Sequence, residues 1–208
     1  MSPRDKDTRT DLLRAAERLF AERGVDAVSL REIAQAAGQK NHSAALYHFG
    51  DKRSLLDALL ARHSDPIQAG WLVVVEHMAA QGRDDLDELV GLMVRTLVHK
   101  LDDDDGGPEY LNVVAQLISS PHFPITEMEA TNAPGIVALS GAMMRHIGEI
   151  EPNLYPLRML GVTSLLYGTI ASYQRLVRVG FDISHESLIA DLTQSIGGLL
   201  RGAPRRAP

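Results

Sequence analysis

The chain has 208 residues and a mass of 22.7 kDa, the size of one or two ordinary domains. Hydrophobic residues make up 45% of the sequence and charged residues 23%, a globular composition that excludes an intrinsically disordered chain. The 21 Lys and Arg residues are outnumbered by 27 Asp and Glu residues. The net charge of −6 excludes a histone-like protein that coats DNA through bulk positive charge.

The sequence contains no cysteine, which excludes disulfide scaffolds, thiolate zinc sites and cysteine nucleophiles. Residues 1–9 are charged and lack the apolar segment of a secretory signal peptide. The longest charge-free stretch, residues 110–126, contains Asn, Gln and Pro and is too polar to span a bilayer. We therefore expect a soluble cytoplasmic protein with no membrane partner.

Charge and proline divide the chain near residue 65. Residues 1–60 carry ten basic and nine acidic residues, whereas residues 61–208 carry eleven and eighteen. No proline occurs between Pro3 and Pro66. We expect one domain over residues 1–50 and a second over residues 51–202. The second begins with a connecting helix at about 51–63, and a disordered tail is expected at 203–208.

Short helices with tight connections are predicted for the first domain. Apolar residues at helical spacing predict a helix over about residues 8–23. A second helix begins at Ser29, which forms a capping box with Glu32. A third covers about residues 41–48, and Asp51 is placed as the N-cap of the fourth. A glycine that can end a helix in left-handed backbone follows each of the first three stretches: Gly24, Gly38 and Gly50.

The rest of the chain is also predicted to be helical, near residues 66–80, 84–101, 108–119, 134–149, 154–179 and 184–201. Pro108 and Ser184 stand at suitable first turns. The Val73–Val75 run has β propensity, but no second strand is near enough to pair with it, so a helix is favoured. Residues 102–108, DDDDGGP, are predicted to form a solvated loop. The predicted fold class is all-α.

The second helix, the turn after Gly38 and the third helix form a helix–turn–helix pattern. Such a pattern holds one helix clear of the body, so that it can enter a DNA major groove about 12 Å wide. Small residues let the two helices approach closely, and polar residues at the leading end of the third helix can reach base edges and phosphates. The small residues are Ala34, Ala36, Ala37, Ala44 and Ala45, and the polar residues are Gln39, Lys40, Asn41, His42 and Ser43.

On these residues the sequence resembles the TetR family of transcriptional regulators. The matching segments are TRTDLLRAAERLFAERGVDAVSLREIAQAAG from residue 8 and ALYHFGDKRSLLDALL from residue 45. The resemblance implies a three-helix DNA-binding domain joined through helix four to a helical-bundle effector and dimerisation domain. It also implies a repressor that binds palindromic operator DNA as a homodimer and is released by a small-molecule effector.

The resemblance implies DNA contacts from ten positions: Ser29, Arg31, Gln39, Lys40, Asn41, His42, Ser43, Tyr47, His48 and Lys52. Other roles stay open for some of them. Ser29 can be a helix cap alone, Tyr47 and His48 can be packing residues, and the lysines can be solvated charges. The sequence departs from the family at Leu46, which replaces a common aromatic residue, and in a turn that is one residue longer.

The last two long helices are expected to form the dimer interface, as the resemblance implies. The first of them carries small residues at about helical spacing in a charge-free stretch, which allows close helix packing. The alternative is that these residues belong to the core of one subunit. The candidate interface residues are Gly161, Ser164, Leu165, Gly168, Leu188, Leu192 and Ile196.

The earlier body helices are expected to enclose an apolar or amphipathic effector. Apolar walls with scattered polar groups suit such a ligand, and methionine adapts to irregular guests. The alternative is that these side chains simply fill the core. The candidate ligand-binding residues are Trp71, Met93, Tyr110, Gln116, Met143, Met144, Tyr155 and Met159.

An enzyme is the main rival interpretation, and we do not expect one. No G-x-S-x-G elbow, P-loop or dinucleotide fingerprint occurs, so no catalytic residue and no cofactor are predicted. His185-Glu186 lacks the second histidine of H-E-x-x-H, and the eight histidines show no convincing ligand spacing, so no metal site is expected. A regulator without a small-molecule effector and a transcriptional activator both stay open.

Overall fold

The computed structural model describes residues 3–41, 43–120, 133–147, 150 and 154–202. Every regular element within these ranges is helical, which confirms the predicted all-α fold. In chain order the elements are α1 (Pro3–Arg23), α2 (Leu30–Ala36), α3 (Ala44–Phe49), α4 (Lys52–Ala80), α5 (Leu86–His99), the 3-10 helix η1 (Lys100–Asp102), α6 (Gly107–Ser119), α8 (Pro134–Met144), α9 (Tyr155–Arg178) and α10 (His185–Arg201).

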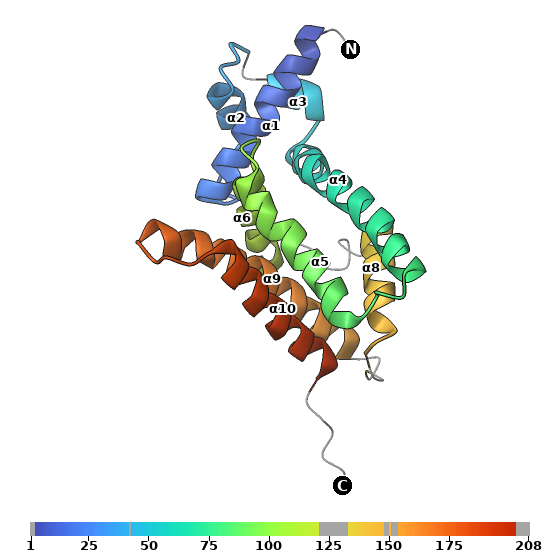
Figure 1. Cartoon of the computed structure of the whole chain (residues 1–208). Helices are drawn as coiled ribbons and strands as arrows, with labels where there is room; N and C mark the ends of the chain where they lie inside the picture. The colour runs from blue at the N-terminus through green and yellow to red at the C-terminus, as the bar shows by residue number, and fades with distance from the viewer. Residues whose placement is uncertain (1–2, 42, 121–132, 148–149, 151–153, 203–208) are drawn as a thin grey trace.

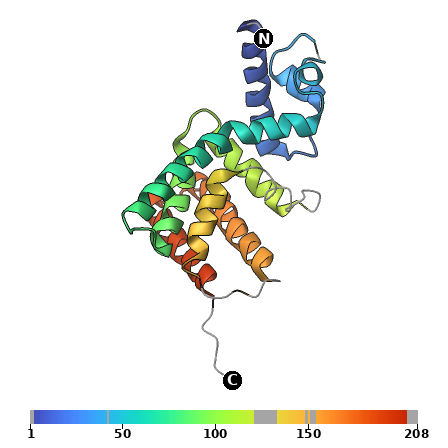
Figure 2. The same ribbon diagram turned by 90° about the vertical axis from the view of Figure 1, so that its right-hand side faces the viewer.

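The helices gather into two groups that α4 connects. Helices α1, α2 and α3 lie together at the end that carries the N-terminus, and the later helices form the larger group (Figure 1). The turned view separates the groups, with α4 running from one to the other (Figure 2). We call the described part of residues 3–50 the head and the described part of residues 81–202 the body.

The head core begins with the apolar stripe of α1. Leu12, Ala16 and Phe20 are fully buried, as helical spacing predicted. Helix α4 contributes the fully buried Leu55, and α6 contributes the fully buried Val113. The head core therefore continues past residue 50 into the connecting helix and one body helix.

The body core lies between α4, α5, α6, α8, α9 and α10. Helix α10 packs along α5 and α9, and α8 packs against α4. The largest fully buried side chains of this core are Leu89, Leu97, Leu111, Leu166, Ile170, Leu192 and Ile196. Among the described residues, the helices fall short of the length and apolar character that a membrane crossing needs.

Helix α4 corrects the prediction of two separate helices at 51–63 and 66–80. It runs without a break over 29 residues, with Pro66 inside it. Proline lacks an N–H and its ring crowds the carbonyl four residues earlier, so it usually ends or kinks a helix. Here both flanking segments are anchored by burial, with Leu59 before the proline and Trp71 and Val75 after it. Val73–Val75 lies in this helix, which confirms that the run is not a strand.

The other helix ends differ from the prediction by up to three residues, except at three places, and one of these is the start of α1, which lies at Pro3 and not near residue 8. The predicted 134–149 helix ends at Met144, and the predicted 84–101 helix changes to 3-10 geometry at Lys100. Three glycines adopt positive φ and end helices as predicted, namely Gly24 at 86°, Gly38 at 70° and Gly50 at 79°. The predicted disordered tail, 203–208, lies outside the described residues.

Candidate nucleic-acid interface

The start of α2 is fixed by the predicted capping box. The Ser29 hydroxyl accepts a hydrogen bond from the Glu32 backbone N–H (3.3 Å) and donates one to the Glu32 carboxylate (2.7 Å). The Ser29 backbone N–H also donates to that carboxylate (2.9 Å), and Arg23 pairs with it at 2.8 Å. These hydrogen bonds, above all those from Ser29, lower the pKa of Glu32 to about 2. The Ser29 side chain is therefore a working helix cap.

The turn between α2 and α3 begins with a Schellman motif. The Gly38 N–H donates to the Gln35 carbonyl, and the Gln39 N–H donates to the Ala34 carbonyl, both at 3.0 Å. Gly38 can adopt this left-handed conformation without a side-chain clash. Further along, the Asn41 side-chain oxygen accepts the Ser43 N–H at 3.0 Å. These local bonds set the direction in which α3 leaves the turn.

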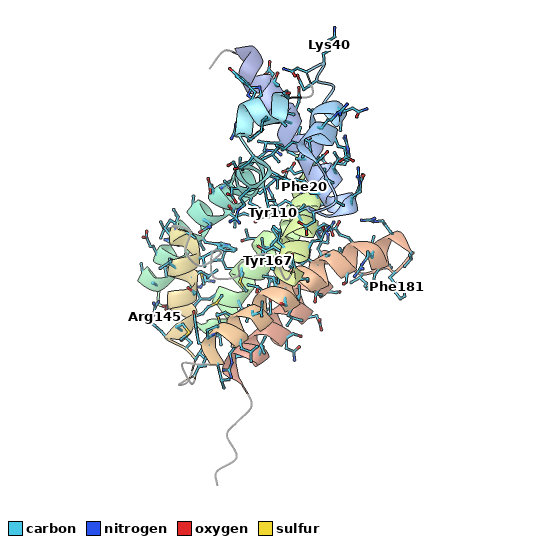
Figure 3. All side chains as sticks on the ribbon, turned by 180° about the vertical axis from the view of Figure 1, so that it is seen from behind. Phe20, Lys40, Tyr110, Arg145, Tyr167 and Phe181 are labelled. Atoms are coloured by element: carbon cyan, nitrogen blue, oxygen red, sulfur yellow. The ribbon has the colours of Figure 1, made fainter. Side chains whose placement is uncertain are left out.

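The leading end of α3 presents polar and aromatic groups to solvent. Tyr47 is 81% exposed and Leu46 is 55% exposed, which is high for large apolar groups. Lys40 projects from the end of the head that is farthest from the body (Figure 3). Of the other predicted contact residues, Arg31, Asn41 and Ser43 are exposed, Gln39 and His48 are half-buried, and His42 lies outside the described residues.

Lys52 has a role inside the head that the sequence did not indicate. Its ammonium group donates to the backbone carbonyls of Val25 (2.8 Å), Asp26 (3.3 Å) and Val28 (3.0 Å). These carbonyls belong to the connection between α1 and α2. The Lys52 side chain therefore ties the start of α4 to that connection, and a phosphate contact by Lys52 stays a prediction.

Comparison with known proteins agrees with this geometry. Residues 12–59 match a family model described as bacterial regulatory proteins, tetR family. The N-terminal part of this chain is a TetR-family domain. The HTH-type transcriptional repressor KstR2 of Rhodococcus jostii is 43% identical over 68 residues, which make up 32% of each chain. The chain spans 32% to 40% of the length of the curated relatives it matches.

Solved structures extend the likeness to the whole fold. A TetR-family regulator of Mesorhizobium loti aligns with a TM-score of 0.55 at 18% identity, over 96% of this chain and 98% of that one. A γ-butyrolactone receptor described as ArpA-like aligns with a TM-score of 0.51 at 17% identity, over 93% and 98%. At such low identity the likeness shows the fold, so the body as well as the head has the architecture of TetR-family regulators.

A buried charged network ties the TetR-family head to α4 and to the body. Glu17 of α1 is 1% exposed, and His63 of α4 is 2% exposed. The Glu17 carboxylate lies 2.5 Å from His63 Nε2 and accepts a hydrogen bond from Arg62 at 2.7 Å. Arg62 also donates to the Asp105 backbone carbonyl at 3.0 Å and pairs with its carboxylate. The network joins α1, α4 and the loop after η1, whose contacting residues are 43 to 46 positions apart, so no local sequence pattern indicated it.

The loop at residues 102–108 leaves Asp102, Asp104 and Asp105 exposed, as predicted for a solvated loop, but it also contacts the head. The Asp105 carboxylate pairs with Arg62 and, at 2.8 Å, with Arg14 of α1, which is 91 residues away in the sequence. Hydrogen bonds from Arg62 and then Arg14 lower the pKa of Asp105. Next to it, Gly106 has φ 91°, and a side chain there would collide with the Glu17 carboxylate. The loop is a contact between body and head.

Most of the predicted ligand-binding residues lie together, but in packed core. Trp71, Tyr110 and Met143 are buried there, and Met93 and Met159 pack against them. The Trp71 indole N–H donates to the Thr96 hydroxyl at 3.1 Å. The Tyr110 ring stacks on His63 with centroids 4.8 Å apart.

The other three predicted ligand-binding residues lie elsewhere. The Gln116 side chain donates to the Ala21 carbonyl of α1 at 3.0 Å, so it faces the head and not the body interior. Met144 is exposed at the end of α8, and Tyr155 is half-buried at the start of α9. A groove of about 650 Å³ between α5 and α10 is lined by none of the eight predicted residues. A second hollow, of about 370 Å³ beside the α1–α2 connection, includes Gln116.

Three of the predicted dimer residues need correction. Leu188, Leu192 and Ile196 are buried within one subunit, where α10 packs on α5 and α9, so they cannot face a partner chain. The periodicity of α10 correctly indicated which face is buried. It did not indicate that α5 and α9 cover that face. On α9, Ser164 and Gly168 are exposed, whereas Gly161 and Leu165 are half-buried.

The connection between α9 and α10 forms an exposed apolar tip that the sequence did not indicate. The connection from α9 to α10 reaches away from the rest of the body, with Phe181 at its end (Figure 3). Phe181 is 58% exposed, and Leu176, Val177 and Val179 near it are exposed as well. Exposed apolar patches of this kind mark interaction surfaces in many soluble proteins.

Proposed function

We propose that this protein is a TetR-type transcriptional repressor that binds double-stranded operator DNA through α2 and α3. The observation that carries the proposal is the exposure of Lys40, Asn41, Ser43 and Tyr47 in the turn before α3 and on α3 itself, within a segment that matches the TetR family model. A helix held in this way fits a major groove, and its polar end can contact bases and phosphates. The match to curated repressors over the head supports the same role.

The test is a selection of binding sites from random duplex DNA by the purified full-length protein. We expect enrichment of an inverted repeat, with half-sites about one helical turn apart or more. A chain with Tyr47→Ala and Lys40→Ala should enrich nothing. The matched control is Arg83→Ala, which removes an exposed cation from the body. Equal enrichment by the double variant would contradict the proposal.

We further propose that the protein is a homodimer through the outer face of α9 and the apolar tip after it. Ser164 and Gly168 lie exposed on that face, and a side chain added at Gly168 would meet open space. The exposed Val179 and Phe181 continue the surface to the tip. Gly161 instead lies against Leu199 of α10, so it serves the packing of the two helices within one subunit.

Sedimentation of two matched variants tests the dimer. Gly168→Arg should convert the protein to a monomer, because it places a long charged side chain in the proposed interface. Gly141→Arg is the control, since Gly141 is also a helical glycine with open space around its Cβ position, but lies on α8. A Gly168→Arg protein that stays dimeric would show that the interface lies elsewhere.

We propose that an apolar or amphipathic small molecule releases the DNA by binding in the body. One relative of the same fold is a γ-butyrolactone receptor, which supports such a ligand, and Trp71, Tyr110 and Met143 would line its site only once their packed core opens. Ligand entry would displace core packing and, through Tyr110 on His63, reach the network at Glu17. The coupling must be reciprocal, so saturating operator must weaken effector binding by the same factor.

Native mass spectrometry of the purified protein tests the effector proposal. A dimer that carries an organic molecule would support it and would identify the molecule's chemical class. Trp71→Ala should then reduce the bound fraction, whereas Val73→Ala, an exposed position on the same helix, should not. If both variants retain the organic molecule equally, the body core is excluded as its binding site.

A further inference from the structure

Two histidines and an aspartate from three elements converge at one end of the body. His99 is the last residue of α5, Asp102 the last of η1, and His185 the first of α10. One possible ligand atom from each of the three residues lies within 4.8 Å of the corresponding atoms of the other two. His99 and His185 are far apart in the sequence and meet because α10 packs along α5 (Figure 1).

The distances within this cluster suit ligands around an ion better than direct contacts. Asp102 Oδ2 lies 3.5 Å from His185 Nδ1 and 3.8 Å from His99 Nδ1. Both separations exceed the roughly 2.7–3.2 Å of an N–H···O hydrogen bond. Around a tetrahedral ion with bonds of about 2.1 Å, neighbouring ligand atoms stand roughly 3.4 Å apart. Two of the three pairs are thus near the spacing of metal ligands, and the two histidine nitrogens lie within 4.8 Å of each other.

The donor set defines the class of ion. Two imidazole nitrogens and one carboxylate oxygen suit zinc and similar divalent transition metals, whereas calcium and magnesium prefer oxygen ligands. We propose that His99, Asp102 and His185 bind a divalent transition-metal ion of the zinc type. A water molecule would complete a four-coordinate site.

The surroundings leave the site accessible and hold one ligand in place. His99 and His185 line the groove of about 650 Å³ between α5 and α10, together with Glu186 and two arginines. One of these, Arg201, is paired with Asp87 at 2.6 Å, which limits its repulsion of a cation. The His185 ring lies beside the Tyr173 ring, and the Tyr173 hydroxyl donates to the carbonyl of Ile183, just before α10.

Metal binding at this site would act on the loop that contacts the head. Asp102 ends η1, and the next residue, Asp103, accepts the Asp105 N–H at 2.9 Å and pairs with Lys100. Asp105 in turn pairs with Arg14 of the head and with Arg62 of α4. An ion that fixes Asp102 to α5 and α10 would therefore restrain this loop. The site itself does not depend on the proposed DNA-binding function.

Cobalt titration of the tag-free, full-length protein tests the proposal, after a chelator has removed bound metal. We expect one Co²⁺ per chain, visible absorption bands from nitrogen and oxygen coordination, and displacement of the cobalt by Zn²⁺. His185→Asn and Asp102→Asn should each weaken binding by roughly tenfold or more. His77→Asn is the control, because His77 is an exposed histidine on α4, away from the cluster.

Two results would overturn the site. One is the lack of cobalt bands at a large excess of Co²⁺, and the other is equal affinity in the wild type and the His185 and Asp102 variants. If His185→Asn lowers the helical circular dichroism, His99→Asn replaces it, since His99 is exposed at a helix end. Hydrogen exchange gives a second readout without DNA. Zinc should slow exchange at the amides of Asp105 and Gly107 in the wild type but not in Asp102→Asn.

Discussion

The head and the body are stabilised by interactions of different range in the sequence. In the head, the ends of α2 are set by residues within five positions of one another, as in the Ser29–Glu32 box and the Gly38 turn. In the body, α10 is held by α5 and α9, and the loop at Asp105 is held by arginines of α1 and α4. Local motifs shape the surface proposed to meet DNA, and distant contacts fix how that surface is attached.

The largest effect on stability is expected at Arg62, where the head is attached to α4 and to the body loop. Arg62→Ala leaves the Glu17 carboxylate buried without its guanidinium partner, and should lower the free energy of unfolding by about 3–5 kcal/mol. Arg53→Ala is the control on the same helix, because its pair with Asp57 is exposed and worth about 0.3–0.5 kcal/mol. Urea unfolding at one fixed protein concentration measures both. Equal losses would show that the buried network does not anchor the head.

A second prediction separates the body core from the surface of α9. Leu192→Ala removes a fully buried side chain and should destabilise the protein by about 2–5 kcal/mol, without changing its oligomeric state. Leu157→Ala, at a largely exposed position of α9, should change stability by less than about 0.5 kcal/mol. Thermal unfolding and sedimentation of both variants check this. A Leu192→Ala protein that is stable but monomeric would show that Leu192 lies in a dimer interface.

A smaller effect is expected from the cap of α2. Ser29→Ala should cost about 1 kcal/mol, because it removes the hydroxyl of the capping box. Ser43→Ala serves as the comparison, since Ser43 stands at the N-cap of α3 but its side chain makes no capping hydrogen bond there. Hydrogen exchange at the first amides of α2 and α3 measures the two local effects. Similar protection changes in both helices would contradict the assignment.

The smallest effect concerns pH. The pKa of Glu32 falls from 4.5 to about 2 on folding, so its ionised form stabilises the head fully above about pH 4.5. That contribution is lost as the pH falls from about 4.5 towards 2, where the carboxylate becomes protonated in the folded protein too. Glu32→Gln should flatten this part of the stability–pH curve. An unchanged slope in the variant would show that other carboxylates account for it.

The sequence predicted what depends on local chemistry. Helix type, the capping box at Ser29 and the glycine ends at Gly38 and Gly50 followed from residues close together in the chain, and the structure confirms them. The unbroken α4 could not be predicted, because Pro66 is a local signal to stop and the burial that overrides it is tertiary.

In the candidate sites, too, contacts that depend on tertiary structure could not be predicted from the sequence. Resemblance to a family indicated which head residues stand near the leading end of α3, but the bonds from Lys52 to three carbonyls required the folded connection. The network at Glu17 joins residues far apart in the sequence, and in the metal cluster only His99 and Asp102 are close in the chain, so no spacing rule indicates that His185 joins them. Periodicity also gave the buried face of α10 without showing that it covers α5.

The central claim is that the exposed leading end of α3 binds DNA, and the affinity of single variants for the selected duplex tests it most directly. We predict that Tyr47→Ala and Lys40→Ala weaken binding severalfold or more, while His77→Ala leaves it unchanged. Lys40→Ala should also reduce the salt dependence of binding by roughly two counterions for a dimer, one for each lysine lost. Wild-type affinity and an unaltered salt slope in both head variants would contradict the account.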